Sequence, residues 1–179
     1  MRANPKAALT VIWALPASRI LQSNRSLNVN GRHVGNLPVG DDIQACLTGP
    51  GQAGAWEATF VSASKASSRI YTFSSIEAEG NLHEGVFAGP IESYSGRGSG
   101  VPFLIAALRT DSDDAYAVAA QRSQDYIKKH PGMPISYVLE QTNRFPQLAW
   151  RVIWGASAST SDYSVFVDAT MGTFIEKAH

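Results

Sequence analysis

The sequence has little of what a disulfide-bonded, metal-binding or strongly charged protein requires. Cys46 is its one cysteine, which excludes an intrachain disulfide and a metal cluster held by thiolates. A lone cysteine is more often a small buried apolar residue than a reactive thiol. Neither sign of charge is in excess, because 15 lysines and arginines balance 15 aspartates and glutamates. This balance gives no reason to expect nucleic acid or an acidic membrane surface as a partner.

Motifs for catalysis and for metal binding are also lacking. The four histidines form no pair with the spacing of metal ligands; they are His33, His83, His130 and His179. No Gly-x-Ser-x-Gly motif is present, and the glycines of residues 95–100 lack the Gly-Lys pair of a phosphate-binding loop. The pairs Asp41-Asp42 and Asp113-Asp114 fit a solvated loop and a helix start better than acid–base catalysis. We therefore expect no catalytic residue, no cofactor and no metal, and we do not expect an enzyme.

Long hydrophobic runs are missing as well. The apolar run of residues 7–15 is too short to span a membrane. With Arg2 and Lys6 before it and small residues after it, this run has the outline of a short signal peptide. A helix of the fold explains it too, with Asn4 as N-cap and Pro5 at the first position, and we favour the helix.

What the sequence does contain is enough apolar residues for a packed core, 44% of 179 residues. Leu148, Trp150, Val152 and Trp154 alternate with Ala149, Arg151 and Ile153, which is the spacing of a strand with one buried face. A second alternating run covers residues 163–168. Asp168 to Gly172 then forms a turn, because Asp168 can accept bonds from turn amides and Gly172 can take a positive φ.

Helical spacing precedes these strands. Acidic residues from Asp111 onward start a predicted helix over about residues 112–130, and Pro131-Gly132 ends it. Ala115 and Ala119 share one side, where small residues let a helix lie close to a sheet. The predicted fold class is α+β, with a helix on an antiparallel meander of strands near 135–142, 148–155, 163–168 and 173–176.

The second half carries a family resemblance. Pro146-x-x-x-Trp150-Arg-Val, a polar loop, and then Val167-Asp168-Ala169-Thr170-x-Gly172-x-Phe174 resemble the end of a PepSY domain. The resemblance covers roughly residues 111–177 and is most specific in the final hairpin. It implies a cystatin-like helix on a small antiparallel sheet.

The first half repeats some of this pattern. Strands are predicted at residues 56–61, 68–73 and 81–87, and Trp56-x-x-x-Phe60 echoes Trp150-x-x-x-Trp154. We therefore predict two such units in tandem: a degenerate first unit at 1–92, a glycine-rich linker at 93–102, and a PepSY-like unit at 103–179.

The candidate ligand surface is the aromatic and basic set on the central strands. It comprises Trp150, Arg151, Trp154 and Tyr163. Its aromatic members are most simply core, although aromatics on a sheet can also receive a peptide or a sugar. Asp168 and Gly172 are assigned a structural role in the turn.

Two other functions remain open beside a binding module. The PepSY resemblance implies a non-enzymatic binding or regulatory module in extracytoplasmic bacterial proteins, with peptide binding or protease inhibition as its role. A small enzyme with a site between the two halves, flanked by loops at 31–55 and 95–100, is the first alternative. A structural subunit that dimerises through a sheet face is the second. The sequence identifies no ligand, and a cytoplasmic location stays open.

Overall fold

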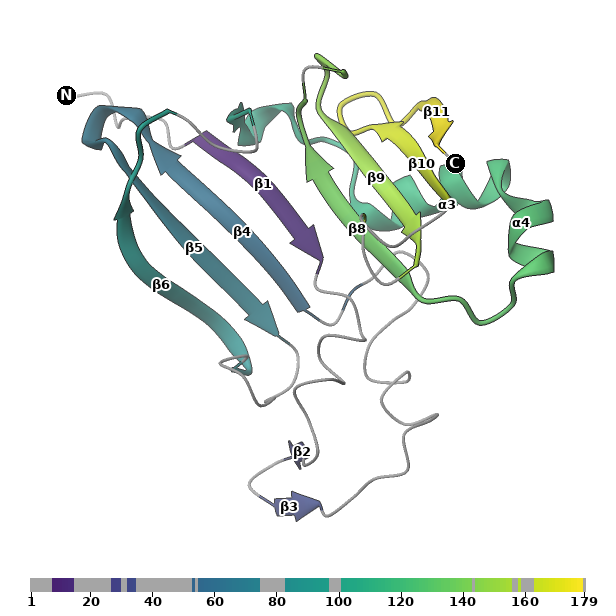
Figure 1. Ribbon diagram of the computed structural model, residues 1–179, viewed down its shortest axis with the longest axis horizontal. Coiled ribbons are helices and arrows are strands. Elements are labelled where there is room, and N and C mark those ends of the chain that lie inside the picture. Colours follow the sequence, from purple (N-terminus) through teal and green to yellow (C-terminus); the bar gives the residue numbers. More distant parts are fainter. Residues whose placement is uncertain are drawn as a thin grey trace.

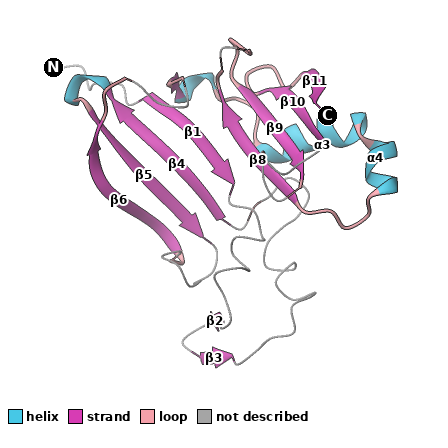
Figure 2. Cartoon of the chain, in the orientation of Figure 1, coloured by secondary structure: helices cyan, strands magenta, loops and turns pink. Residues whose placement is uncertain are grey.

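The protein is an α+β structure built on one large antiparallel sheet. The computed structural model describes residues 8–14, 27–29, 32–34, 53, 55–74, 83–96, 101–142, 144–155, 158 and 163–178. Figures 1 and 2 show this sheet with two consecutive helices beside one half of it and a small two-stranded ribbon apart from it. The predicted fold class is therefore confirmed at the level of α+β with antiparallel pairing.

The large sheet combines a three-stranded and a four-stranded meander. Its strands are β1 (Ala8–Ala14), β4 (Ala55–Ser62), β5 (Ser67–Ser74), β6 (Gly85–Ser93), β7 (Phe103–Leu104), β8 (Ile135–Glu140), β9 (Ala149–Trp154), β10 (Tyr163–Asp168) and β11 (Phe174–Ala178). Their order is β11-β10-β9-β8-β1-β4-β5-β6, with β7 also paired to β1. Strand β1 thus joins the two meanders, because it pairs with β4 on one side and with β8 on the other.

The predicted N-terminal helix is wrong, since residues 8–14 form strand β1. The run contains the β-branched residues Thr10, Val11 and Ile12, which favour a strand over a helix. Partners on both sides complete the hydrogen-bonding of this segment. Asn4 and Pro5, on which the helix prediction depended, lie outside the described residues.

The other strands of the first half agree in part with prediction. Strands β4 and β5 confirm the runs at 56–61 and 68–73, joined by a 3₁₀ turn, Ala63–Lys65. Strand β6 begins later than expected and continues to Ser93, so it includes the start of the predicted linker. The run from Leu27, whose sequence favours a strand that leads into a turn at Gly31, forms β2 (Leu27–Val29), and β3 (Arg32–Val34) pairs with it where a loop was expected. Residues 19–23, whose sequence favours a strand, and residues 41–47, whose sequence favours a short helix, lie outside the described residues.

The predicted helix at 112–130 is divided into α3 (Ser112–Arg122) and α4 (Gln124–Lys129). Asp111 caps α3 as expected, because its side chain accepts a hydrogen bond from the amide of Ser112. The break falls at Ser123, whose φ of −119° is not helical. Ser123 is buried there, and the hydroxyl groups of Tyr163 and Ser123 are 3.0 Å apart in a hydrogen bond.

The main core lies between α3 and the second meander. Ala115 and Ala119 have no exposed surface and allow α3 to pack directly on β9 and β10, as predicted. The strand side chains of this core point to the same face; they include Trp150, Val152, Trp154, Tyr163, Val165 and Val167. Burial of this continuous apolar layer is the main force that holds helix and sheet together.

The β10–β11 turn has the predicted chemistry. Asp168 Oδ1 accepts hydrogen bonds from the amides of Thr170 and Met171, each at 2.8 Å. Gly172 has a φ of +68°, and a Cβ at this position would lie 3.3 Å from Thr110 Oγ1. The positive φ therefore favours glycine at 172, and any larger residue would also require Thr110 to shift slightly.

Asp168→Ala should lower the free energy of unfolding by about 1 kcal/mol, because both amide bonds to the carboxylate are lost in a partly solvated turn. Urea unfolding followed by tryptophan fluorescence measures this difference. Asp168→Asn keeps an acceptor oxygen and should lose less than Asp168→Ala. Equal midpoints for wild type and Asp168→Ala would show that the turn bonds add no net stability.

Candidate functional site

Three of the four residues of the predicted ligand surface lie in the core. Trp150, Trp154 and Tyr163 are 3%, 2% and 3% exposed. Trp154 meets Tyr163 edge-on, with ring centroids 5.5 Å apart, and Tyr163 stacks on Tyr126 of α4 at 4.0 Å. Their burial favours the core interpretation, since a ligand would have to displace the helices to reach these rings.

Arg151 lies on the opposite face of the sheet. Its Nε donates to Ser164 Oγ at 3.1 Å, and its guanidinium lies over the ring of Phe166, 5.4 Å from the centroid. The structure therefore brings the three aromatic residues together and separates Arg151 from them, as expected for alternating positions of a strand.

Arg151 shares its face with a partly buried carboxyl group. Glu140 ends β8 and pairs with Ala149 of β9, diagonal to Arg151. Burial raises the pKa of Glu140, and the positive charge of Arg151 opposes that rise without cancelling it. The ionised form of Glu140 is thus less favourable in the folded protein than in the unfolded chain.

Glu140→Gln should stabilise the protein at neutral pH. A carboxyl group whose pKa is raised on folding contributes stability below its unfolded pKa and loses that contribution as the pH rises through the folded value. The advantage of the glutamine variant should therefore be present at pH 7.5 and disappear below about pH 4, where a free glutamate is protonated. Urea midpoints at the two pH values test this, with the exposed Glu92→Gln as control. A wild type more stable than Glu140→Gln at pH 7.5 would mean that attraction to Arg151 outweighs burial.

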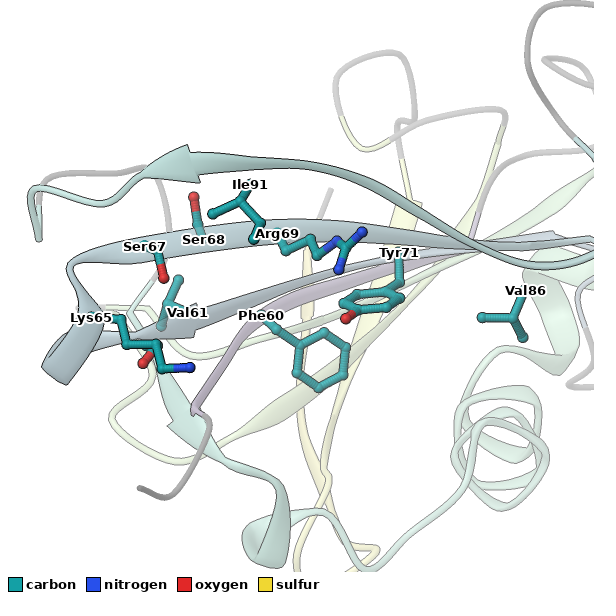
Figure 3. Close-up of a pocket in the computed structure, with 10 residues that line it drawn as sticks. Phe60, Val61, Lys65, Ser67, Ser68, Arg69, Tyr71, Val86 and Ile91 are labelled. Carbon is teal, nitrogen blue, oxygen red and sulfur yellow. The ribbon is translucent and has the colours of Figure 1, made fainter. Parts of the chain in front are cut away.

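A concave surface suited to a ligand lies on the first meander, where the sequence did not predict one. Side chains of β4, β5 and β6 line a groove with a volume of about 670 Å³. We call it the β4–β6 groove and define it by Phe60, Lys65, Arg69, Tyr71, Val86 and Ile91, all labelled in Figure 3. Its volume falls in the range of about 300–1,000 Å³ that is usual for ligand sites.

Strand register explains why these residues meet. Phe60 on β4 pairs with Arg69 on β5, and Arg69 pairs with Ile91 on β6, so all three point to one face. The rings of Phe60 and Tyr71 meet edge-on, with centroids 5.3 Å apart. The Arg69 guanidinium lies 5.5 Å from the Tyr71 ring centroid, within cation–π range.

In the described part of the chain the groove is apolar and open, because neither α3 nor α4 covers it. Trp56 and Phe60 of β4 still pack against the main core, whereas Phe73, Val86 and Ile91 are 41%, 70% and 71% exposed. Figure 1 shows α3 and α4 beside β8–β11 and away from β5 and β6. The inner sheet face thus continues past the core as an uncovered apolar surface, which is the usual mark of a binding surface.

Strand β6 also forms one edge of the sheet. No strand lies on its outer side in the part of the chain that the structure describes. A β-bulge at Gly89 and Pro90 of β6, opposite Ile70 of β5, interrupts the pairing. Proline lacks an amide hydrogen, so this edge offers two short pairing segments and not one long one.

A smaller hollow of about 390 Å³ lies at the junction of α3 and α4. Arg122, Lys129 and Lys177 line it together with Asp125. Ser123 and Tyr163 lie at its floor and are hydrogen-bonded to each other, where α3 ends and α4 begins. Its mixed charge and its structural floor make it a weaker candidate than the β4–β6 groove.

Neither metal-ligating clusters nor membrane-spanning helices occur among the described residues. Among them no three histidine, cysteine, aspartate or glutamate side chains come together as metal ligands. The described helices are also too short or too polar to cross a lipid bilayer.

Comparison of the chain with family models, curated proteins and solved structures gives no match. The likeness to PepSY domains therefore depends only on the residues quoted for it, and the site has to be interpreted from its own geometry.

Proposed function

We propose that the chain is a non-enzymatic binding module that holds an extended protein segment against strand β6. The observation that carries this proposal is the coincidence of a sheet edge with an uncovered apolar face on the same strand. An extended segment can pair its backbone with such an edge, while its side chains occupy the adjacent groove.

The PepSY resemblance supports the same proposal. It implies a cystatin-like unit in the second half, a tandem relation between the two halves, and a regulatory or protease-inhibiting role in an extracytoplasmic protein. In this proposal the helix-covered second meander is the rigid scaffold, and the exposed first meander is the binding half. Strand β6 is itself held by its pairing with β5, and a strand that is already in place loses less entropy on binding.

The exposed face also suits a second copy of the chain, which is the structural-subunit alternative. Two β6 edges related by a twofold axis would pair antiparallel and bury Val86 and Ile91. Light scattering of the purified protein distinguishes the two, since only the alternative predicts a stable dimer that depends on β6.

Selection from a displayed library of random twelve-residue peptides tests the binding proposal. Wild type should enrich sequences with apolar residues at alternate positions, the pattern of a strand with one bound face. The double variant Val86→Lys with Ile91→Lys should bind the enriched peptides at least about tenfold more weakly, because charges on an edge strand oppose strand addition.

Met171→Lys is the matched control, since Met171 is also 71% exposed but lies in the β10–β11 turn. It should bind the enriched peptides like wild type. Failure to enrich any peptide, or equal binding by the double variant, would contradict the proposal. A wild-type dimer that the double variant dissolves would favour the structural subunit.

A further inference from the structure

We propose that the segment held by the β4–β6 groove carries an acidic side chain beside an apolar one, with the carboxylate bound by Arg69 and Lys65. This inference rests on the proposed function and specifies the partner of the same site. The occupant is a segment of a partner protein, because the positive charge of the groove is complementary to an internal Asp or Glu.

The charges of the groove have one sign. Lys65 extends from the 3₁₀ turn between β4 and β5, and Arg69 projects from β5. None of the described lining residues is acidic. Among the described residues, neither Lys65 nor Arg69 forms an ion pair; the salt bridge that does form joins Arg144 to Glu176. Two cations that form no ion pair with a described residue, beside apolar walls, favour an anionic group on the bound segment.

The position of Arg69 is fixed by the fold. Its Nε donates to the carbonyl oxygen of Gly89 at 2.8 Å. Gly89 belongs to β6, so this bond draws the guanidinium from β5 across to the edge strand, at the β-bulge. There the terminal nitrogens have no hydrogen bond within the described residues, and they are the atoms that hold a carboxylate in two parallel bonds. A guanidinium already held in place loses little freedom on binding.

The apolar part of the groove accepts the neighbouring side chain. Phe60 and Tyr71 form its floor, and Val86 and Ile91 lie along β6. On an added strand, side chains that face the groove recur at every second residue, about 7 Å apart. An acidic residue at the bulge therefore places the residues two positions before and after it over this apolar floor. The expected motif is an Asp or Glu flanked at i±2 by aliphatic or aromatic residues.

Three synthetic peptides test the motif. Each has ten residues of alternating threonine and valine, and one central valine is replaced by Glu, Gln or Lys. Fluorescence anisotropy with the intact protein gives their dissociation constants. The Glu peptide should bind about five- to tenfold more tightly than the Gln peptide, the ratio of a partly solvated charge-assisted contact, and the Lys peptide should bind most weakly. The Glu preference should shrink as salt is raised.

Variants of Lys65 and Arg69 show which side chain causes the preference for Glu over Gln. Lys65→Gln should reduce the ratio of Glu to Gln affinity, and Arg69→Gln should abolish it, while Lys177→Gln on β11 should leave it unchanged. Arg69→Lys keeps the charge without the two-pronged geometry and should retain part of the preference. Arg69→Gln could fail to fold because it loses the bond to Gly89. In that case Lys65→Gln, and the three peptides with wild type, still test the preference for Glu.

The outcomes separate this inference from the proposed function. Equal, measurable affinities for the Glu and Gln peptides on wild type would overturn the acidic motif and leave segment binding in place. A Glu preference that survives in both Lys65→Gln and Arg69→Gln would place the carboxylate elsewhere and would also overturn it. Absence of binding by all three peptides, and by the peptides enriched from the library, would overturn the proposed function itself.

Discussion

Replacing Trp150 by alanine should lower the free energy of unfolding by about 3–5 kcal/mol, the usual cost of truncating a buried aromatic side chain. The indole is 3% exposed, and it meets the ring of Trp56 edge-on with centroids 6.0 Å apart. Its Nε1 donates to the carbonyl oxygen of Thr110 at 2.8 Å. The substitution thus removes contacts between the two meanders and leaves a buried carbonyl group without its partner.

Urea unfolding followed by circular dichroism measures this loss, since the variant removes a fluorophore. Trp150→Phe separates the two contributions: it keeps most of the apolar volume and should cost about 1–3 kcal/mol through the unpaired Thr110 carbonyl and a smaller ring. Met171→Ala, at a residue that is 71% exposed, should stay within about 0.5 kcal/mol of wild type. A Trp150→Ala variant as stable as wild type would contradict the assignment of this indole to the core.

Ala119→Leu should destabilise the protein by about 1–3 kcal/mol, because α3 lies directly against β9 and β10 at this residue. Ala119 has no exposed surface, so three additional carbon atoms must displace the helix or its neighbours. Thermal and urea unfolding both report the change, and a helix pushed off the sheet would also alter near-ultraviolet circular dichroism from the buried tryptophans.

Ala117→Leu provides the matched control on the same helix. Ala117 is exposed, and leucine is nearly as good a helix former as alanine, so this variant should change stability by a few tenths of a kcal/mol. If Ala119→Leu were equally harmless, the interface between α3 and the sheet would have to contain room that its burial does not indicate.

The parts of the fold that the sequence predicts are those fixed by local signals. Strand β10 was predicted at its observed bounds, because alternation and the Asp168 turn both lie within a few residues. The break at Ser123 was not predicted; the partner of Ser123 there is Tyr163, which belongs to another element far along the chain. Strand β1 was missed for a similar reason: local capping signals favoured a helix, and pairing with β4 and β8 prevailed.

The candidate site was less predictable than the fold. The strand at 56–61 was predicted from its spacing, but the exposure of the sheet beyond Phe60 depends on where the helices lie. The sequence does not indicate that α3 packs over Trp150 and leaves Val86 exposed to solvent. The role of Arg69 depends on a bulge in the neighbouring strand, which no spacing rule indicates.

The double pairing of β1 has a consequence for how the chain reaches its folded state. Val11 pairs both with Thr59 and with Glu140, so one neighbour of β1 is synthesised early and the other near the end. Contacts between segments so distant in sequence slow folding, because the loop between them must be closed first. On the ribosome, β1 and the first meander can assemble while β8 is still missing, and the unpaired side of β1 is then open to other chains. Synthesis of β8 closes that side, so nascent chains that stop before residue 135 should aggregate more readily than the full-length protein.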